Sequence, residues 1–303
     1  MLARWLAGGV VAAALIVGTA MTGAQTLRPL APLPPDGLRV APIFEGWYEN
    51  ADGSLTMSFG FSNPNTTGVV EIPIGPDNFI EPKEFNGRQP TIFSSVQAAG
   101  EGAGDGGGGG RARRERQRGV FTVTVPPGFK GEVVWTLRYN GITSSVPGSN
   151  RTGAYGLRWP MAMGSIPPLL RFSEKGPAGR GPSGIDAPPL QAKVGAPLPL
   201  TIWVHDDSNR IEDPTPVRER ANPNNGAINV SWAKHQGPVG AMIKFDPVRT
   251  PLKELQGTVS TTATFERPGD YLIRVTADNF GRLDTSSGNQ CCWTNGYIKV
   301  TVQ

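Results

Sequence analysis

The sequence predicts an all-β protein built from two β-sandwich domains with long Gly/Pro-rich loops. Three observations carry this prediction. Apolar and polar residues alternate in many short runs, which is the pattern of strands with one buried face. Glycine (40) and proline (29) together make up about a quarter of the 303 residues, which is high for a globular chain. No long stretch after the N-terminus shows the periodicity of an amphipathic helix.

The clearest strands lie at the C-terminal end of the chain. Apolar residues alternate with polar ones over 259–265 and again over 271–277. Pro268-Gly269 lies between the two runs and favours a turn, so we expect them to pair as an antiparallel hairpin. A last alternating run, 297–302, ends with the chain.

This end of the chain resembles a PKD-like or immunoglobulin-like module over roughly residues 187–303. The resemblance rests on Phe265-x-x-Pro268-Gly269-x-Tyr271, on Arg274-Val275-Thr276-Ala277-Asp278-Asn279 and on the closing Ile298-Lys299-Val300-Thr301-Val302. The aspartate-rich turn of a typical PKD domain is missing. The resemblance therefore implies an Ig-like β-sandwich, a fold that spaces, presents or binds and that does not define an activity.

The remaining chain divides by composition. We predict an N-terminal β-sandwich over 44–172, starting with a β-meander over 44–82. A disordered insertion is predicted over 98–118, where five consecutive glycines meet an arginine-rich tract. A linker follows over 173–189, and the C-terminal Ig-like sandwich occupies 190–303.

Residues 1–24 have the features of a secretory signal peptide. Arg4 precedes an apolar run over 6–17, and Thr22-Gly23-Ala24 forms a cleavage site that leaves Gln25 first. The alternative is an uncleaved membrane anchor, although the apolar run is short for a bilayer span. A proline-rich leader over 25–43 follows. We expect a periplasmic or secreted protein with no transmembrane span after cleavage.

Three phrases of the chain are similar to a set of exported bacterial proteins of unassigned activity. They are Phe44-Glu45-Gly46-Trp47-Tyr48-Glu49-Asn50, Ile72-Pro73-Ile74-Gly75-Pro76-Asp77-Asn78 and Gln290-Cys291-Cys292-Trp293-Thr294-Asn295. The resemblance implies export and supplies no catalytic residues.

The formal net charge is +4, and residues 111–118 (RARRERQR) alone contribute that amount. The rest of the chain is therefore neutral. This distribution excludes the broad basic surface of a nucleic-acid binder, so no specific nucleic-acid binding is expected. A solvated loop and a loop that binds anionic polymers or lipid headgroups both remain open for the arginine-rich tract.

Catalytic patterns are scarce. The chain has two histidines, His205 and His235, and it lacks a G-x-S-x-G elbow and the spacings of zinc sites. Candidate acids are Glu45, Glu49, Glu71 and Glu81. The favoured hypothesis is a non-enzymatic binding or structural protein of the periplasm or cell surface. The alternative is a secreted hydrolase or carbohydrate-active protein with a site between the domains.

No cofactor is predicted, with calcium as the open alternative. Asp206 and Asp207 end one predicted strand, and Asp278 and Asn279 end another. In an Ig-like sandwich the B–C and F–G loops cluster at one end, where hard oxygen ligands could hold Ca²⁺. Polar loop ends without a metal are the competing interpretation.

A ligand platform is predicted at Trp159, Cys291, Cys292 and Trp293. Trp159 lies in a proline-flanked loop and Trp293 beside the cysteines, so these two aromatic residues are expected to be exposed. A glycan or another envelope protein are the candidate partners. The two adjacent cysteines could form a strained vicinal disulfide, remain thiols or bridge to another chain.

Export gives the first testable prediction. N-terminal sequencing of protein recovered from the periplasm or medium should begin at or near Gln25, because the small-x-small site precedes it. Full-length protein recovered from the cytosol would contradict the prediction.

Overall fold

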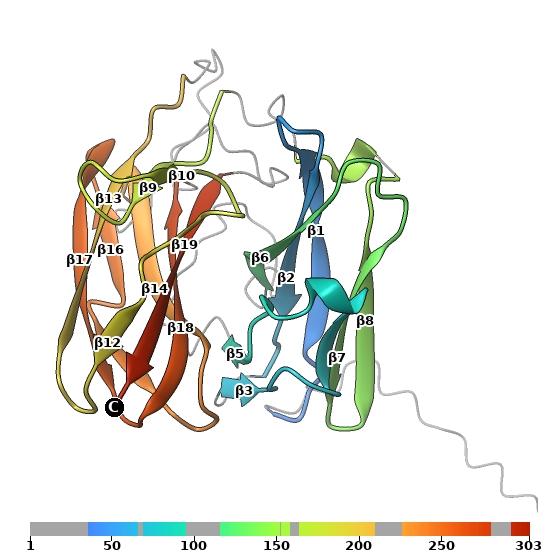
Figure 1. The fold of residues 1–303 in the computed structure, drawn as a ribbon, viewed down its shortest axis with the longest axis horizontal. Coiled ribbons are helices and arrows are strands. Elements are labelled where there is room, and N and C mark those ends of the chain that lie inside the picture. Colours follow the sequence, from blue (N-terminus) through green and yellow to red (C-terminus); the bar gives the residue numbers. More distant parts are fainter. Residues whose placement is uncertain are drawn as a thin grey trace, which may run out of the picture. The chain divides into compact units, whose positions relative to one another are not determined.

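The computed structural model describes residues 36–65, 69–94, 116–151, 153–157, 164–209, 226–279 and 292–303. Within these ranges the chain is all β, as predicted, with short 3-10 turns at η1 (Lys83–Phe85) and η3 (Gly153–Tyr155). The strands form two sandwiches, one from β1 to β8 and one from β9 to β19 (Figure 1). Both sandwiches lie within residues 34–303, which form one compact unit.

The N-terminal sandwich packs two three-stranded sheets around one core. The first sheet contains β1 (Ala41–Glu49), β2 (Leu55–Ser62) and β6 (Arg116–Val125), and the second contains β4 (Asn78–Glu81), β7 (Val133–Tyr139) and β8 (Ile142–Gly148). A further pair joins β3 (Val69–Glu71) to β5 (Ile92–Ser94). The first hairpin of the predicted meander is confirmed, because β1 pairs with β2 across the turn that contains Asp52-Gly53. The meander is wrong beyond it, because β3 pairs with β5 and β4 with β7.

Aromatic rings fill the core of this sandwich. Phe59 and Phe121 stack with ring centroids 5.4 Å apart, and Trp135 of the other sheet meets Phe121 edge-on at 4.9 Å. The indole Nε1 of Trp135 donates to Asn78 Oδ1 at 3.0 Å, and the Asn78 Nδ2 donates to the Ile72 carbonyl. Aromatic packing therefore joins the two sheets. The satisfied Asn78 amide joins β4 to β7 within the second sheet and to the segment at Ile72.

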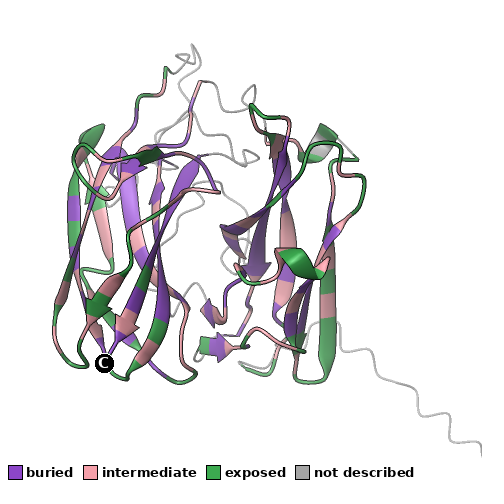
Figure 2. Ribbon diagram, viewed as in Figure 1, coloured by how far each residue is buried: buried purple, intermediate pink, exposed green. Residues whose placement is uncertain are grey.

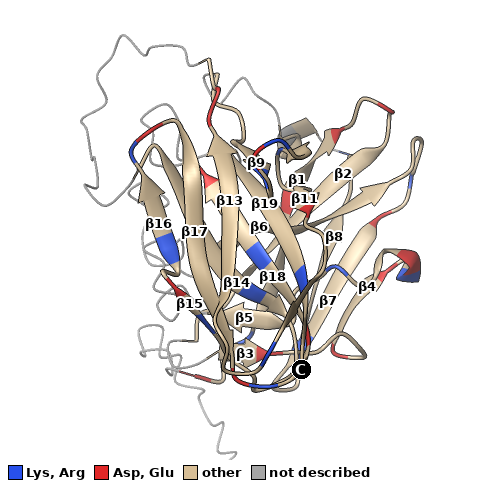
Figure 3. Cartoon of the chain, turned by 60° about the vertical axis from the view of Figure 1, so that its left-hand side comes forward, with Lys and Arg blue, Asp and Glu red and all other residues tan. Residues whose placement is uncertain are grey.

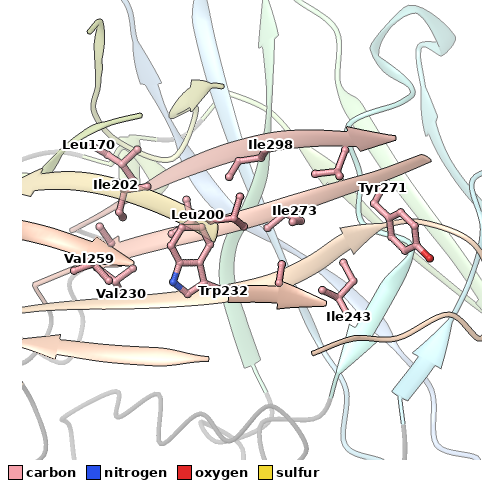
Figure 4. Close-up of a cluster of buried hydrophobic side chains, with 14 of the residues drawn as sticks. Leu170, Leu200, Ile202, Val230, Trp232, Ile243, Val259, Tyr271, Ile273 and Ile298 are labelled. Atoms are coloured by element: carbon pink, nitrogen blue, oxygen red, sulfur yellow. The ribbon is translucent and has the colours of Figure 1, made fainter. Parts of the chain in front are cut away.

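The C-terminal sandwich has the Ig-like strand order. One sheet runs β10-β9-β13-β17-β15, and the other runs β11-β19-β18-β14-β16, with β12 also paired to β19. In chain order the strands are β9 (Leu169–Arg171), β10 (Ala178–Gly179), β11 (Ile185–Asp186), β12 (Leu190–Ala192), β13 (Leu198–His205), β14 (Ile228–Gln236), β15 (Ile243–Asp246), β16 (Arg249–Leu252), β17 (Gln256–Phe265), β18 (Gly269–Asp278) and β19 (Trp293–Val302). Side chains from both sheets meet around Trp232 (Figure 4). Buried residues follow the strands, and exposed residues gather toward the connections (Figure 2).

The predicted hairpin between 259–265 and 271–277 is wrong. Strand β17 pairs with β13 and β15, whereas β18 pairs with β14 and β19, so the Pro268-Gly269 turn carries the chain from one sheet to the other. Alternation showed that each run has one buried face, and both faces do meet in the same core. Alternation does not show which sheet a strand joins. The Tyr271 hydroxyl donates to the Arg267 carbonyl at 2.7 Å and pins this crossing, as a tyrosine corner does.

The predicted boundaries differ from the structure in two places. Residues 173–189, expected as a linker, contain β10 and β11, and β11 pairs in parallel with β19. Gly184 has φ +65°, and an added Cβ would lie 1.8 Å from the Asn295 carbonyl oxygen, so this glycine permits close packing against β19. The insertion expected over 98–118 overlaps β6, which begins at Arg116. Residues 1–35 and 95–115 lie outside the described ranges.

The tyrosine corner gives the second prediction. Tyr271→Phe removes the hydrogen bond to the Arg267 carbonyl and keeps the ring in the core, so the free energy of unfolding should fall by about 1 kcal/mol. Denaturant unfolding measures this. Tyr139→Phe is the matched control, because Tyr139 packs against the N-terminal core and makes no such corner. Equal effects of the two substitutions would show that the corner contributes nothing.

Candidate functional site: the interface between the sandwiches

Strand β19 presents two different faces. Ile298, Val300 and Val302 point into the C-terminal core. Because side chains alternate along a strand, Trp293, Asn295 and Tyr297 share the opposite face. All three are buried, at 2%, 0% and 1% exposure, while Lys299 and Thr301 farther along that face are not. The N-terminal sandwich covers the first half of this face.

The three side chains donate hydrogen bonds to one point on β6. Trp293 Nε1 and Asn295 Nδ2 reach the Gly119 carbonyl oxygen at 3.2 and 2.7 Å, and the Tyr297 hydroxyl reaches the Val120 carbonyl at 3.0 Å. These carbonyls are available because the register of β2 with β6 shifts between Phe59 and Phe61. A bulge of this kind leaves backbone groups unpaired, and buried ones need partners.

Gly119 is required at this point for two reasons. Its φ of +51° lies in the left-handed region that other residues rarely adopt. An added Cβ would also lie 1.9 Å from Trp293 Cζ2, where no displacement of a flexible chain end could relieve the clash. The indole of the C-terminal sandwich therefore packs directly on the backbone of the N-terminal one.

A second group of contacts joins β14 to the chain around residues 87–91. His235 Nε2 bonds to the Arg88 carbonyl at 2.8 Å, and the His235 carbonyl accepts the Thr91 N–H at 2.9 Å. Gln236 Nε2 donates to the carbonyls of Gly87 and Gln89 at 2.9 and 2.7 Å. Main-chain groups are the partners throughout, so this contact depends on backbone shape.

Charged groups extend the same interface. The Arg88 guanidinium lies 4.0 Å from the centroid of the Tyr297 ring and pairs with Asp186 at 2.9 Å. Lys234 pairs with Glu71 at 3.0 Å, with side-chain exposures of only 7% and 15%, and also donates to the carbonyls of Pro238 and Ala241. A buried ion pair of this kind is costly to break, because the remaining charge stays desolvated.

Ion pairs hold two of the four candidate acids. Glu45 is fully buried and accepts hydrogen bonds from the Nε and Nη2 atoms of Arg116. Glu71 is held by Lys234, and its Oε2 accepts the Gly240 N–H. Glu49 and Glu81 are exposed at strand ends. The Glu45 and Glu71 carboxylates thus serve ion pairs, one within the N-terminal sandwich and one between the sandwiches.

The environment of His235 lowers its pKa to about 3. Burial is the main cause, and the nearby Arg274 charge adds to it, while the hydrogen bond to the Arg88 backbone acts in the opposite direction. The imidazole is therefore neutral at pH 7. Its ring lies edge-on to Tyr297 at a centroid distance of 5.4 Å, and burial raises the pKa of that tyrosine.

The predicted calcium ligands all make contacts within the protein. Two of them converge, because Ser208, which donates to Asp206, and Asn279 both donate to the Ile166 carbonyl. Asp206 is buried and accepts from the backbone and hydroxyl of Ser208, and Asp207 makes a two-oxygen contact with Arg180 at 2.9 Å. Asp278 accepts from Asn229 at 3.4 Å. Asn279 is fully buried and donates to the Ile166 carbonyl at 3.0 Å. In the described part of the chain, no group of three or more His, Cys, Asp and Glu side chains is placed to hold a metal.

The predicted aromatic and cysteine platform is placed only in part. Trp159 and Cys291 lie outside the described ranges. The expected exposure of Trp293 is wrong, because its indole is covered by Gly119. Cys292 is fully buried and disulfide-bonded. Cys291 is the chain's other cysteine, and the vicinal bond stays a prediction.

Sequence reasoning missed Gly119, Asn295 and His235 as interface residues. A signal for Gly119 was present, since a glycine inside the alternating run RQRGVFTVTV is typical of a bulge or a close backbone approach. The alternation predicted over 297–302 begins at Tyr297, and it could have been extended back to Trp293. Nothing in the sequence pairs His235 with the Arg88 backbone.

Comparison with known proteins adds solved structures of low similarity. No protein-family model matches the sequence, and no curated protein matches it. Domains 4 and 5 of the S-layer protein SbsC match at 12% identity and a TM-score of 0.23, covering 59% of this chain and 68% of that one. The D0-D1 domain of intimin matches at 10% identity and a TM-score of 0.23, covering 86% of this chain and 97% of that one. The Yersinia pseudotuberculosis adhesin InvE matches at 7% identity and a TM-score of 0.23, covering 86% of this chain and 58% of that one. In the residues described, no helix has the length and apolarity to cross a membrane.

Buried His235 gives the third prediction. Its pKa of about 3 in the folded state lies below 6.5, the ordinary pKa of histidine, which applies in the unfolded state. Between these two pH values the unfolded state therefore binds more protons than the folded state. The stabilisation is present above pH 6.5 and is lost as the pH falls toward 3. Each pH unit in this window costs about 1.4 kcal/mol, so roughly 2 to 3 kcal/mol disappears between pH 6.5 and 4.5.

His235→Gln tests this assignment, because glutamine keeps a donor near the Arg88 carbonyl and does not titrate. The measurement is denaturant unfolding across the same pH range. The wild type should lose stability more steeply than the variant. Parallel pH profiles would show that another group causes the acid sensitivity.

Proposed function

We propose that the protein is an exported, non-enzymatic module of the periplasm or cell surface, in which the two sandwiches act as one rigid binding or structural element. The observation that carries the proposal is the contact of Trp293, Asn295 and Tyr297 with the Gly119–Val120 backbone. Domains joined by small polar interfaces usually move relative to each other. Here side chains of one sandwich bond to the main chain of the other, and a contact of this kind supports a fixed orientation.

Export is supported by the signal-peptide pattern of residues 1–24. A rigid pair of sandwiches is suited to presenting a surface at a defined distance or to forming part of an envelope layer. A glycan or another envelope protein remains the proposed partner class, and calcium at the ends of β13 and β18 remains a proposal. The alternative of a hydrolase with a site between the sandwiches gains no support from Glu45 or Glu71, since ion pairs occupy both carboxylates.

Rigidity gives the fourth prediction. Nitrogen-15 relaxation of the folded protein should give one rotational correlation time for amides of both sandwiches. Gly119→Ala places a Cβ against the Trp293 indole, so the interface should open and two correlation times should appear.

The control is Gly153→Ala, where an added Cβ meets nothing within 4 Å. This variant should tumble as the wild type does. Two correlation times in the wild type, or wild-type tumbling of Gly119→Ala, would contradict the rigid module.

A further inference from the structure

Trp203 occupies an unusual position on β13. Leu200, Ile202 and Val204 point into the core, and the alternating residues Thr201, Trp203 and His205 are only partly buried. The solvent face of a sheet usually carries polar residues. A large indole in the middle strand of a five-stranded sheet therefore stands where core packing does not require it.

The strand register defines the neighbours of this indole. Arg171 of β9 and Thr258 of β17 are its direct cross-strand partners. Two residues after Trp203 on β13, His205 lies opposite Leu169 and Gln256. Two residues before it, Thr201 lies opposite Ser260, and their hydroxyl groups share a hydrogen bond of 2.9 Å. Facing residues on one side of a sheet have Cβ atoms about 5 Å apart, so the indole is surrounded by polar groups.

This face is hollowed around the tryptophan. The hollow has a volume of about 370 Å³, and its lining includes Arg171, Glu174, Trp203, His205, Gln256 and Thr258. Pockets for small ligands begin near 300 Å³, so it has room for one or two sugar rings. Charged residues are sparse along β13 and β17 (Figure 3). Arg171 and Glu174 carry the opposite charges of the lining, which is therefore neutral overall.

We propose that this hollow binds an uncharged polysaccharide chain, with a pyranose ring packed against the Trp203 indole. A sugar ring presents C–H groups on its faces and hydroxyl groups, each both donor and acceptor, at its edge. The lining supplies the matching groups: an aromatic face, a donor in Arg171, an acceptor in Glu174, and groups of both kinds in Gln256 and Thr258. The balanced charge favours an uncharged polymer over an acidic one.

The same residues fit a protein partner less well. The centre of a protein–protein interface is depleted in charged residues and rich in apolar ones. Here polar side chains from β9, β13 and β17 surround a single indole. The inference deepens the proposed function by naming a ligand class, and it does not depend on the rigidity of the interface.

Affinity electrophoresis of the purified full chain tests the proposal, using gels that contain hydroxyethylcellulose, laminarin, xylan or glycol chitin. At least one neutral polymer should retard the wild type. Trp203→Ala should weaken retardation at least about tenfold, the loss of roughly 1.4 kcal/mol. Arg171→Ala should weaken it too, and Trp203→Phe should restore part of it.

Tyr155→Ala is the matched control, because Tyr155 is an exposed aromatic residue on the N-terminal sandwich. It should bind as the wild type does, and unchanged melting temperatures show that the variants are folded. No retardation in any gel, or equal retardation of the wild type, Trp203→Ala and Arg171→Ala, overturns the proposal. A Trp203-dependent association with a protein would also overturn it and assign the face to a protein partner. A failure to bind polymer does not affect the predictions of export and of one rotational correlation time for both sandwiches. It is therefore distinguishable from a failure of the proposed function.

Discussion

The Gly119 carbonyl oxygen is the point on which the joined structure depends. It accepts hydrogen bonds from Trp293 and Asn295, and the neighbouring Val120 carbonyl accepts one from Tyr297. The carbonyls become available because β6 bulges where it passes β2. The bulge in turn needs a residue that tolerates φ +51° and has no side chain beneath the indole. One glycine thus links the local irregularity of one sandwich to the packing of the other.

The rest of the interface is polar, and most of its groups have partners, although the buried His235 Nδ1 and Thr91 Oγ1 have no hydrogen-bond partner among the described residues. His235 remains neutral and bonds to backbone, Lys234 and Glu71 neutralise each other, and Arg88 covers the Tyr297 ring. Buried polar groups stabilise a structure only when their partners are in place, since an unpaired one costs free energy. An interface of this type fixes one orientation more strictly than an apolar one, because a shift leaves several groups unpaired at once.

The sequence predicted what depends on local pattern. Alternation located the strands around Phe265, Tyr271 and Ile298, and turn residues placed the β1–β2 hairpin. Strand partners were harder, because alternation is identical for a hairpin and for a crossing between sheets. The Tyr271 hydroxyl bond that marks the crossing joins residues four apart, so this signal was present in the sequence.

The candidate site was less accessible to sequence reasoning because it joins distant segments. The position of Trp293 beside the cysteines predicts a ligand contact with an exposed indole. The indole is buried instead, and no sequence pattern shows that β6 lies over it. Composition predicts a linker over 173–189 and does not show that Gly184 allows close contact with β19. The outward position of Trp203 is accessible to sequence reasoning, because Trp203 alternates with the buried residues Ile202 and Val204 on β13.

Native-state hydrogen exchange at increasing denaturant distinguishes one cooperative unit from two, because it measures the opening free energy of each segment. If the Gly119 contact makes the sandwiches one cooperative unit, core amides near Phe59 and Phe121 should open with the same free energy as those near Ile273 and Ile298. A plateau for one core well below the other, with the second core still protected, would show that the sandwiches unfold independently and would contradict the account.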